Sequence, residues 1–227
     1  MQAMDITRGE LAKLIDHAVL HPAHTPEDVR AGAEIAREFA IATLIVKPCH
    51  VALAADLLAG SGVTVGVAIG FPHGSHLPEV KAYETRLARA QGAREFDMVI
   101  NLGALVGGED DLVRREIAMV VEAAEGGVVK VILETAYLAD AQKARGCRLA
   151  EEAGAHFVKT STGFGPRGAT VEDVRFLRQS VSSKVGVKAA GGIRTLSDAL
   201  RMVEAGASRI GTSATRAILE ELEGRSR

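Results

Sequence analysis

Residues 155–192 read AHFVKTSTGFGPRGATVEDVRFLRQSVSSKVGVKAAGG and contain one complete strand–helix–strand unit. The short, β-prone runs 155–158 and 185–187 predict two strands, and a lysine ends each run, Lys159 and Lys188. Between them, Thr170 precedes Asp173 by three residues, which is the spacing of a helix cap. Two strands joined through a helix lie parallel in one sheet, so this stretch predicts an α/β fold.

The same unit repeats along the chain. Eight short β-branched runs alternate with amphipathic helical stretches at intervals of about 20 to 35 residues. The predicted strands are residues 14–16, 43–46, 64–69, 95–100, 128–133, 156–159, 185–188 and 209–211. No linker divides the sequence, so we predict one domain over residues 1–227, a (β/α)8 TIM barrel. A doubly wound open sheet is the alternative, because periodicity does not reveal closure and the first run is weak.

The composition narrows the classes of function. The net charge is −2 and aromatic residues make up 4% of the chain, whereas nucleic-acid binding uses a basic stripe or stacking rings. No apolar run approaches the roughly 18–20 residues of a membrane span, and the first residues lack the apolar core of a secretory signal. Cys49 and Cys147 have no CxxC spacing and predict reduced thiols. We therefore expect a cytoplasmic globular protein without nucleic-acid or membrane partners.

Both lysines are predicted to lie at the carboxyl ends of strands, where barrels form their active sites. If Lys159 and Lys188 share one pocket, each lowers the pKa of the other, and a neutral lysine attacks carbonyl compounds. Lowering a lysine pKa from about 10.4 to about 7 corresponds to about 4.6 kcal/mol. One cation about 4 Å away supplies roughly 4 kcal/mol at an effective dielectric near 20, and partial burial adds to it. The alternative for either lysine is a solvated side chain.

A third charged residue is predicted to point into the barrel. Side chains alternate along a strand, so the apolar Phe96, Met98 and Ile100 share the face toward the helices. Asp97 then faces inward, where Lys130, Lys159 and Lys188 could reach it. A buried carboxylate needs such partners. A structural salt bridge is the alternative to a functional cluster.

Glycine-rich turns after the last two strands predict an anion site. The segment GGIRT at residues 191–195 follows the seventh strand, and Gly211-Thr212-Ser213 follows the eighth. Loops at these positions, with exposed backbone N–H groups and a helix N-terminus, commonly bind phosphate in barrels. The alternative is that the glycines only close turns.

The histidines and cysteines give weaker indications of a functional site. His21, His24, His73 and His76 are not accompanied by further ligands at metal spacing, so we interpret them as loop histidines and predict no metal. Cys49 has no histidine and acid that would make it a nucleophile.

The chain resembles the deoxyribose-phosphate aldolases, class I aldolases, over almost its whole length. The segments that carry the resemblance are residues 14–17 (LIDH), 70–74 (GFPHG), 96–101 (FDMVIN), 129–135 (VKVILET), 157–165 (FVKTSTGFG), 187–194 (VKAAGGIR) and 209–213 (RIGTS). KTSTGFG and GGIRT are the most specific of these. They occur in the same order as in the family.

The resemblance implies a reaction and a set of residues. The reaction is reversible cleavage of 2-deoxy-D-ribose 5-phosphate into acetaldehyde and D-glyceraldehyde 3-phosphate, without cofactor or metal, in deoxyribose phosphate catabolism. Lys159 would form the Schiff base, Lys188 would perturb it, and Asp97 would transfer protons. Substrate and phosphate contacts would come from Asp16, Gly163, Gly191, Gly192, Gly211 and Ser213. The resemblance also suggests a homodimer.

The sequence departs from the family at several polar positions. Ala18, Ala190 and Ala214 stand where family members often carry a hydroxyl, and Lys47 stands where asparagine is frequent. These changes bear on substrate affinity rather than on reaction type. Two other functions compete with the aldolase: a phosphosugar isomerase or transaldolase-like barrel, and a catalytically silent phosphosugar-binding barrel.

Overall fold

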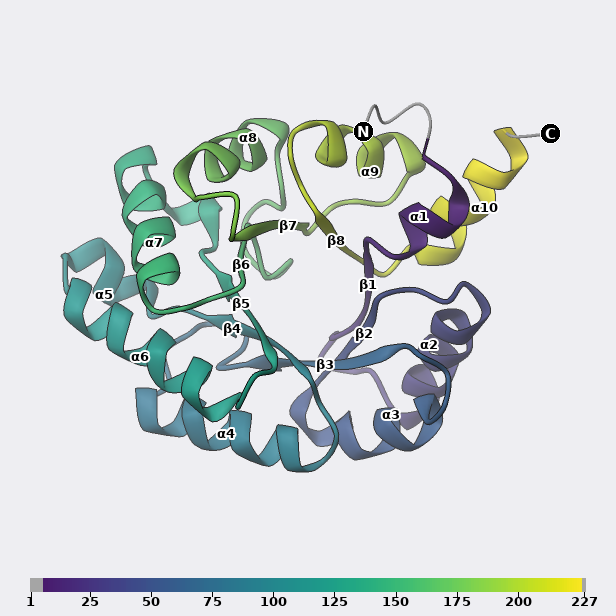
Figure 1. Ribbon diagram of the computed structural model, residues 1–227, viewed down its shortest axis with the longest axis horizontal. Coiled ribbons are helices and arrows are strands. Elements are labelled where there is room, and N and C mark those ends of the chain that lie inside the picture. Colours follow the sequence, from purple (N-terminus) through teal and green to yellow (C-terminus); the bar gives the residue numbers. More distant parts are fainter. Residues whose placement is uncertain (1–5, 226–227) are drawn as a thin grey trace.

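Eight parallel strands form a closed barrel with the helices on its outside (Figure 1). The computed structural model describes residues 6–225, so the predicted domain bounds at residues 1 and 227 lie outside the described part. The strands are β1 Ile15–Val19, β2 Thr43–Val46, β3 Thr64–Ile69, β4 Glu95–Val99, β5 Val128–Ile132, β6 Phe157–Lys159, β7 Gly186–Ala190 and β8 Arg209–Thr212. Because β8 pairs with β1, the predicted (β/α)8 barrel is confirmed and the open sheet is excluded.

The α-helices cover the outside of the barrel, and the helix after β6 begins at its predicted cap, Thr170. They are α1 Arg8–Ala12, α2 Pro26–Glu38, α3 Val51–Leu58, α4 Pro78–Ala90, α5 Leu102–Gly107, α6 Asp110–Ala123, α7 Asp140–Glu152, α8 Val171–Ser180, α9 Leu196–Glu204 and α10 Thr215–Arg225. The hydroxyl of Thr170 accepts from the N–H of Asp173, and Thr195 caps α9 in the same way. No helix within residues 6–225 is long and apolar enough to cross a membrane.

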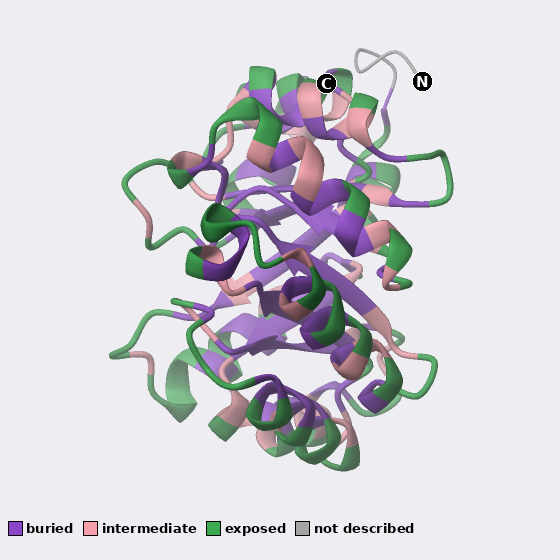
Figure 2. Ribbon diagram, turned by 90° about the vertical axis from the view of Figure 1, so that its left-hand side faces the viewer, coloured by how far each residue is buried: buried purple, intermediate pink, exposed green. Residues whose placement is uncertain are grey.

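The two faces of the barrel strands carry different chemistry. Outward-facing residues such as Phe96, Met98 and Val131 are buried against the helices and form the main apolar core. Figure 2 shows the strands as a buried centre and the outer helix faces as exposed. The inward faces instead carry charged side chains on β1, β4, β5, β6, β7 and β8. Such an interior departs from the branched apolar layers that usually fill this fold.

The strand register brings the charges together. Asp97 on β4 lies opposite Lys130 on β5, and Lys159 on β6 lies opposite Lys188 on β7. Gly211 on β8 leaves room for these long side chains, because a Cβ at this position would lie 3.1 Å from Cε of Lys188. The interior can therefore hold several extended lysines side by side.

Three strands extend beyond their predicted ends, and β8 does so by one residue, to Thr212. β1 continues to Val19, because residues 17–19 pair with β2. β7 continues to Ala190, because Ala189 and Ala190 pair with β8 rather than turning. Lys188 therefore lies in the middle of β7, and the prediction that it ends its strand is wrong. Lys159 does end β6.

A buried ion pair holds the carboxyl end of β4 against the helix layer. The Nζ atom of Lys81 on α4 lies 2.6 Å from Oε2 of Glu116 on α6, and both side chains are fully buried. Lys81 also donates to the carbonyl of Val99, and the other oxygen of Glu116 accepts from the N–H of Asn101. These bonds fix the end of the strand that carries Asp97.

Candidate active site

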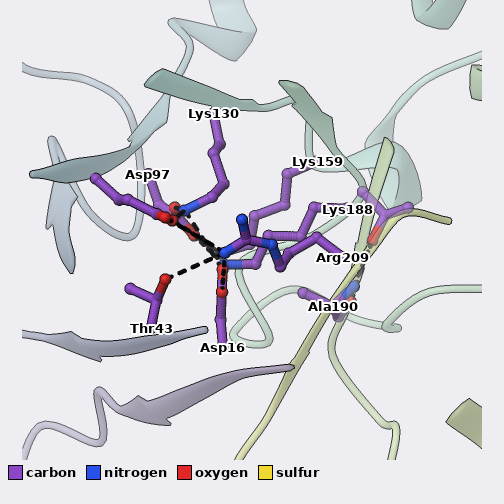
Figure 3. Close-up of polar contacts among 10 residues, drawn as sticks. Asp16, Thr43, Asp97, Lys130, Lys159, Lys188, Ala190 and Arg209 are labelled. Carbon is purple, nitrogen blue, oxygen red and sulfur yellow. Dashed lines mark hydrogen bonds and ion pairs between the residues drawn. The ribbon is translucent and has the colours of Figure 1, made fainter. Parts of the chain in front are cut away.

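Asp97 is the centre of the charged interior. Its Oδ2 atom lies 2.8 Å from Nζ of Lys159 and 2.6 Å from Nζ of Lys188, and its Oδ1 atom lies 2.9 Å from Nζ of Lys130 (Figure 3). The side chain of Asp97 is fully buried. The three residues predicted as catalytic, Lys159, Lys188 and Asp97, are thus brought into direct contact.

Asp16 lies on the other side of Lys188. It forms a short ion pair with Nζ of Lys188, and its Oδ1 atom lies 2.6 Å from Nη1 of Arg209. Figure 3 shows these cations converging on the carboxylates of Asp16 and Asp97. The contact of Asp16 with substrate, which the resemblance implied, stays a prediction, and its oxygens pair with cations of the barrel interior. In this position the Asp16 carboxylate stabilises the Lys188 ammonium, whereas it would repel an anionic group.

The pKa of Lys159 falls to about 8, and burial is its largest cause because it removes the ammonium from water. The Asp97 carboxylate opposes this shift, and the Lys188 and Lys130 ammoniums add to it. The sequence predicts that the neighbouring lysine causes most of this pKa shift, whereas in the structure burial is the larger cause. A substantial fraction of Lys159 is neutral just below pH 8, so the amine can attack a carbonyl.

Asp97 stays ionised at the pH where Lys159 reacts. Burial raises the pKa of its carboxyl, but Lys130, Lys159 and Lys188 together outweigh burial and hold the pKa well below its usual range. The pKa of Asp16 falls to about 2 in the same way, since Lys130, Lys188 and Arg209 outweigh its burial. Both carboxylates therefore act as acceptors, and a donated proton has to come from a lysine or from water.

A cavity of about 370 Å³ opens above the cluster at the carboxyl ends of the strands. Lys159, Lys188 and Asp16 contribute to its lining. The predicted anion-site residues Gly163, Gly191, Gly192, Gly211 and Ser213 line the same cavity. Gly163, Gly191 and Gly192 have φ values of 88°, 88° and 78°, a region that glycine adopts without strain. Two glycine-rich loops and two lysines thus face one space.

Sequence reasoning missed several groups around this cavity. His21, His24 and Arg194 line it. Lys47, one of the departures from the family, holds the loop that carries the two histidines, because its Nζ atom donates to the carbonyls of His21 and His24 at 3.2 and 2.8 Å. Ala18 and Ala190 also line the cavity, so the hydroxyls common in the family are absent from its wall. No set of three or more histidine, cysteine or acidic side chains within residues 6–225 is arranged to hold a metal ion.

Glu134 positions the loop that follows Lys159. Its Oε2 atom accepts from the N–H of Thr162 at 3.1 Å and from the Thr162 hydroxyl. Glu134 has φ of 52°, an uncommon conformation for a non-glycine residue. Gly165 packs on its carboxyl group, since a Cβ at this position would lie 3.0 Å from the carboxyl carbon. This contact orders the turn that carries Gly163 into the cavity.

The chain is similar to known aldolases over most of its length. The sequence profile described as DeoC/LacD family aldolase matches residues 11–221. The deoxyribose-phosphate aldolase of Bacillus mycoides strain KBAB4 is 52% identical over 210 residues, which cover 92% of this chain and 94% of that protein. A solved structure titled "QR15, an Aldolase" is 40% identical, with a TM-score of 0.91 over 95% of this chain and 97% of that chain. The deoxyribose phosphate aldolase of Aeropyrum pernix, titled as a unique tetrameric structure, is 34% identical, with a TM-score of 0.92 over 99% of this chain and 96% of that chain.

Proposed function

The chain belongs to the DeoC/LacD family of aldolases, and on that premise we propose that it cleaves 2-deoxy-D-ribose 5-phosphate reversibly into acetaldehyde and D-glyceraldehyde 3-phosphate. One observation carries the proposal: Lys159 places a buried amine with a pKa of about 8 at the cavity, 2.8 Å from an ionised carboxylate. An amine of this kind forms imines with aldehydes.

The reaction begins with attack of neutral Lys159 on the substrate aldehyde. Loss of water gives an iminium ion, which withdraws electrons from the bond between its α and β carbons. When that bond breaks, the electron pair remains as an enamine on Lys159, the substrate hydroxyl loses its proton, and glyceraldehyde 3-phosphate leaves. Protonation of the enamine carbon and addition of water then release acetaldehyde and regenerate the amine. Each step conserves atoms and electrons within the enzyme, the substrate and one water molecule.

We assign proton transfer to Lys188 together with Asp97. Lys188 lines the cavity and bonds both Asp16 and Asp97, so it can give a proton to the enamine carbon and recover the proton that Asp97 accepted from the substrate hydroxyl. Asp97 lies below the two lysines and acts through them or through a water molecule.

Phosphate binding is proposed at the glycine-rich side of the cavity. Gly191 and Gly192 follow β7, and Ser213 stands two residues before the start of α10. A helix N-terminus and approachable backbone N–H groups favour an anion there. Arg194 adds a cation to the same wall. This arrangement supports a phosphorylated substrate even though Ala18 and Ala190 bring no hydroxyl.

Reduction of the imine tests the proposal directly. With acetaldehyde and borohydride, we expect Lys159 to gain about 28 Da, read by peptide mass spectrometry. Below about pH 8 the labelling rate should fall roughly tenfold per pH unit, because only the neutral amine attacks. The protein that is labelled at Lys159 should also release acetaldehyde from 2-deoxy-D-ribose 5-phosphate. Label on Lys188 would exchange the two lysine roles. Folded protein without any label would favour an isomerase or a silent binder.

We also propose that the protein works in the cytoplasm without a nucleic-acid partner. The net charge of −2 and two free cysteines, Cys49 and Cys147, support this proposal.

A homodimer is proposed through α4. Leu77, Val80, Tyr83 and Leu87 form an exposed apolar stripe along this helix, and each is at least 46% exposed. Glu79 lies toward the amino end of the helix and Arg86 toward its carboxyl end. Two antiparallel copies of α4 that cross near Tyr83 would cover both apolar stripes. The acidic amino half of each helix would then lie against the basic carboxyl half of the other. A second copy of this chain therefore fits the surface in apolarity and in charge.

Leu87→Glu is expected to convert the dimer into a monomer, because it buries a charge within the apolar contact. Light scattering after gel filtration should show the mass fall to the monomer value of 23.8 kDa. Val106→Glu, at an equally exposed apolar residue on α5, is the matched control and should leave the dimer intact. A monomeric wild type, or dissociation by both variants, would contradict the α4 interface.

A further inference from the structure

A second group of charges lies below the catalytic lysines, away from the cavity. The Nη1 atom of Arg209 on β8 lies 2.6 Å from Oδ1 of Asp16 and 3.2 Å from Oε2 of Glu95. Its guanidinium lies over the ring of Phe157, and its side chain is 15% exposed. Glu95 begins β4 and lines a hollow with Thr64 and Val128, which begin β3 and β5. This pair therefore sits at the amino ends of the strands, opposite the substrate cavity.

Lys130 connects this lower pair to the catalytic residues. Its Nζ atom lies 2.5 Å from Oε2 of Glu95, 2.9 Å from Oδ1 of Asp97 and 3.3 Å from Oδ2 of Asp16. The side chain is fully buried. One unbroken chain of ion pairs thus runs from Glu95 and Arg209 through Lys130 and Asp16 to Asp97, Lys188 and Lys159.

The network holds more cations than anions. Four cations, Lys130, Lys159, Lys188 and Arg209, share three carboxylates, Asp16, Glu95 and Asp97. On the inward faces, β2 contributes Thr43 and Ile45, and β3 contributes Gly66 and Ala68, none of which carries a charge. Other titratable groups near the two ends are His21, His24 and Arg194 around the cavity, Glu134 beside the loop after β6, and Arg89, Arg94 and Glu125 around the lower hollow. A surplus positive charge in a buried cluster is costly, so one cation tends to lose its proton.

The number of carboxylate partners decides which cation becomes neutral. Among residues 6–225, Lys130 contacts three carboxylates and Lys188 contacts two, whereas Lys159 contacts Asp97 alone and shares its Oδ2 atom with Lys188. Arginine does not lose its proton in proteins, so Arg209 is a permanent charge. We propose that Arg209 and Glu95 are positioning residues that never touch the substrate, yet keep Lys159 the neutral amine by fixing the charge balance of the barrel interior.

The proposal rests on the proposed imine at Lys159 and makes a prediction that a purely structural role does not. Loss of Arg209 removes a cation, so Lys159 holds its proton to higher pH. Loss of Glu95 removes an anion, so Lys159 gives up its proton at lower pH. A unit charge on the order of 12 Å away, at an effective dielectric near 20, shifts a pKa by roughly one unit. Simple loosening of the site would lower rates without moving the pH midpoint in opposite directions.

The experiment measures the pH midpoint of borohydride trapping of acetaldehyde at Lys159 in four variants. Arg209→Met should shift the midpoint upward by about one pH unit, and Glu95→Gln should shift it downward by about one unit. The double variant R209M/E95Q restores the surplus of one cation and should return to the wild-type midpoint. Arg209→Lys keeps the charge and should also stay near the wild type. Circular dichroism checks that each variant is folded.

Several outcomes would overturn the inference. Shifts of both single variants in one direction, or unchanged midpoints, would reduce Arg209 and Glu95 to structural ion pairs. A double variant that fails to return toward the wild type would do the same. If Arg209→Met does not fold, the other two single variants still test the inference. A lower pH midpoint in Glu95→Gln and an unchanged midpoint in Arg209→Lys would support it, and any other result would contradict it. Absence of trapping in the wild type would refute the proposed function itself, which separates the two failures.

Discussion

Lys159→Arg is expected to reduce kcat/KM for cleavage of the phosphosugar by about 10⁴-fold or more. The guanidinium keeps the positive charge and can still pair with Asp97, but it does not form an imine, so the first chemical step is lost. Losses of this size are typical when the nucleophile of an enzyme is removed. Formation of glyceraldehyde 3-phosphate, followed with a coupled dehydrogenase, measures the loss.

Two controls make the Lys159→Arg result specific. Lys184→Arg makes the same exchange at an exposed lysine just before β7 and should leave turnover unchanged. The thermal midpoint of Lys159→Arg should remain close to that of the wild type, because the ion pair with Asp97 is kept. A folded Lys159→Arg protein that still cleaves the substrate at a comparable rate would exclude the imine mechanism.

Lys188→Leu is expected to have two separate effects. Removing the Lys188 charge raises the pKa of Lys159, because the neighbouring ammonium lowers that pKa in the wild type. Trapping of acetaldehyde at Lys159 should therefore decline near pH 7 and return at higher pH. Turnover should fall by about 10² to 10⁴-fold and stay low at every pH, because the group that passes protons between the cavity and Asp97 is gone.

Lys188→Arg separates charge from proton transfer. It retains the positive charge, so the pH midpoint of trapping at Lys159 should stay near the wild-type value. The guanidinium remains protonated, so turnover should still be low. Wild-type turnover in folded Lys188→Leu would remove Lys188 from the mechanism, and the proton path would then have to run from Asp97 through water alone.

Much of the fold and part of the site could be read from local patterns. The alternation of Phe96, Asp97 and Met98 placed the carboxylate inside the barrel, and the structure finds it fully buried among lysines. The threonine-to-acid spacing at Thr170 marked the start of α8 correctly. Such signals depend on the 2-residue period of a strand and the few residues of a cap, so they can be recognised in the sequence without the tertiary fold.

The same alternation also predicts two further charged residues, Glu95 and Arg209, inside the barrel. Glu95 stands two residues before Asp97, and Arg209 stands two residues before Gly211, so both belong to the inward faces of their strands. Period-two reading of β4 and β8 could have placed both in the interior. It could not have named their partners, because Arg209 meets Asp16 across 193 residues of sequence.

The sequence by itself determined the alternating strand–helix units, the lysine at the end of β6 and the inward aspartate on β4. The tertiary structure decided closure of the sheet, since the pairing of β8 with β1 depends on contacts between the two ends of the chain. It also decided that Lys188 lies in mid-strand, that burial gives the larger share of the lowered pKa of Lys159, and that four cations share three carboxylates. The physical reason is the separation along the chain over which each effect acts. Strand period and helix capping depend on a few neighbouring residues, whereas burial and charge balance arise only when distant strands close around one interior.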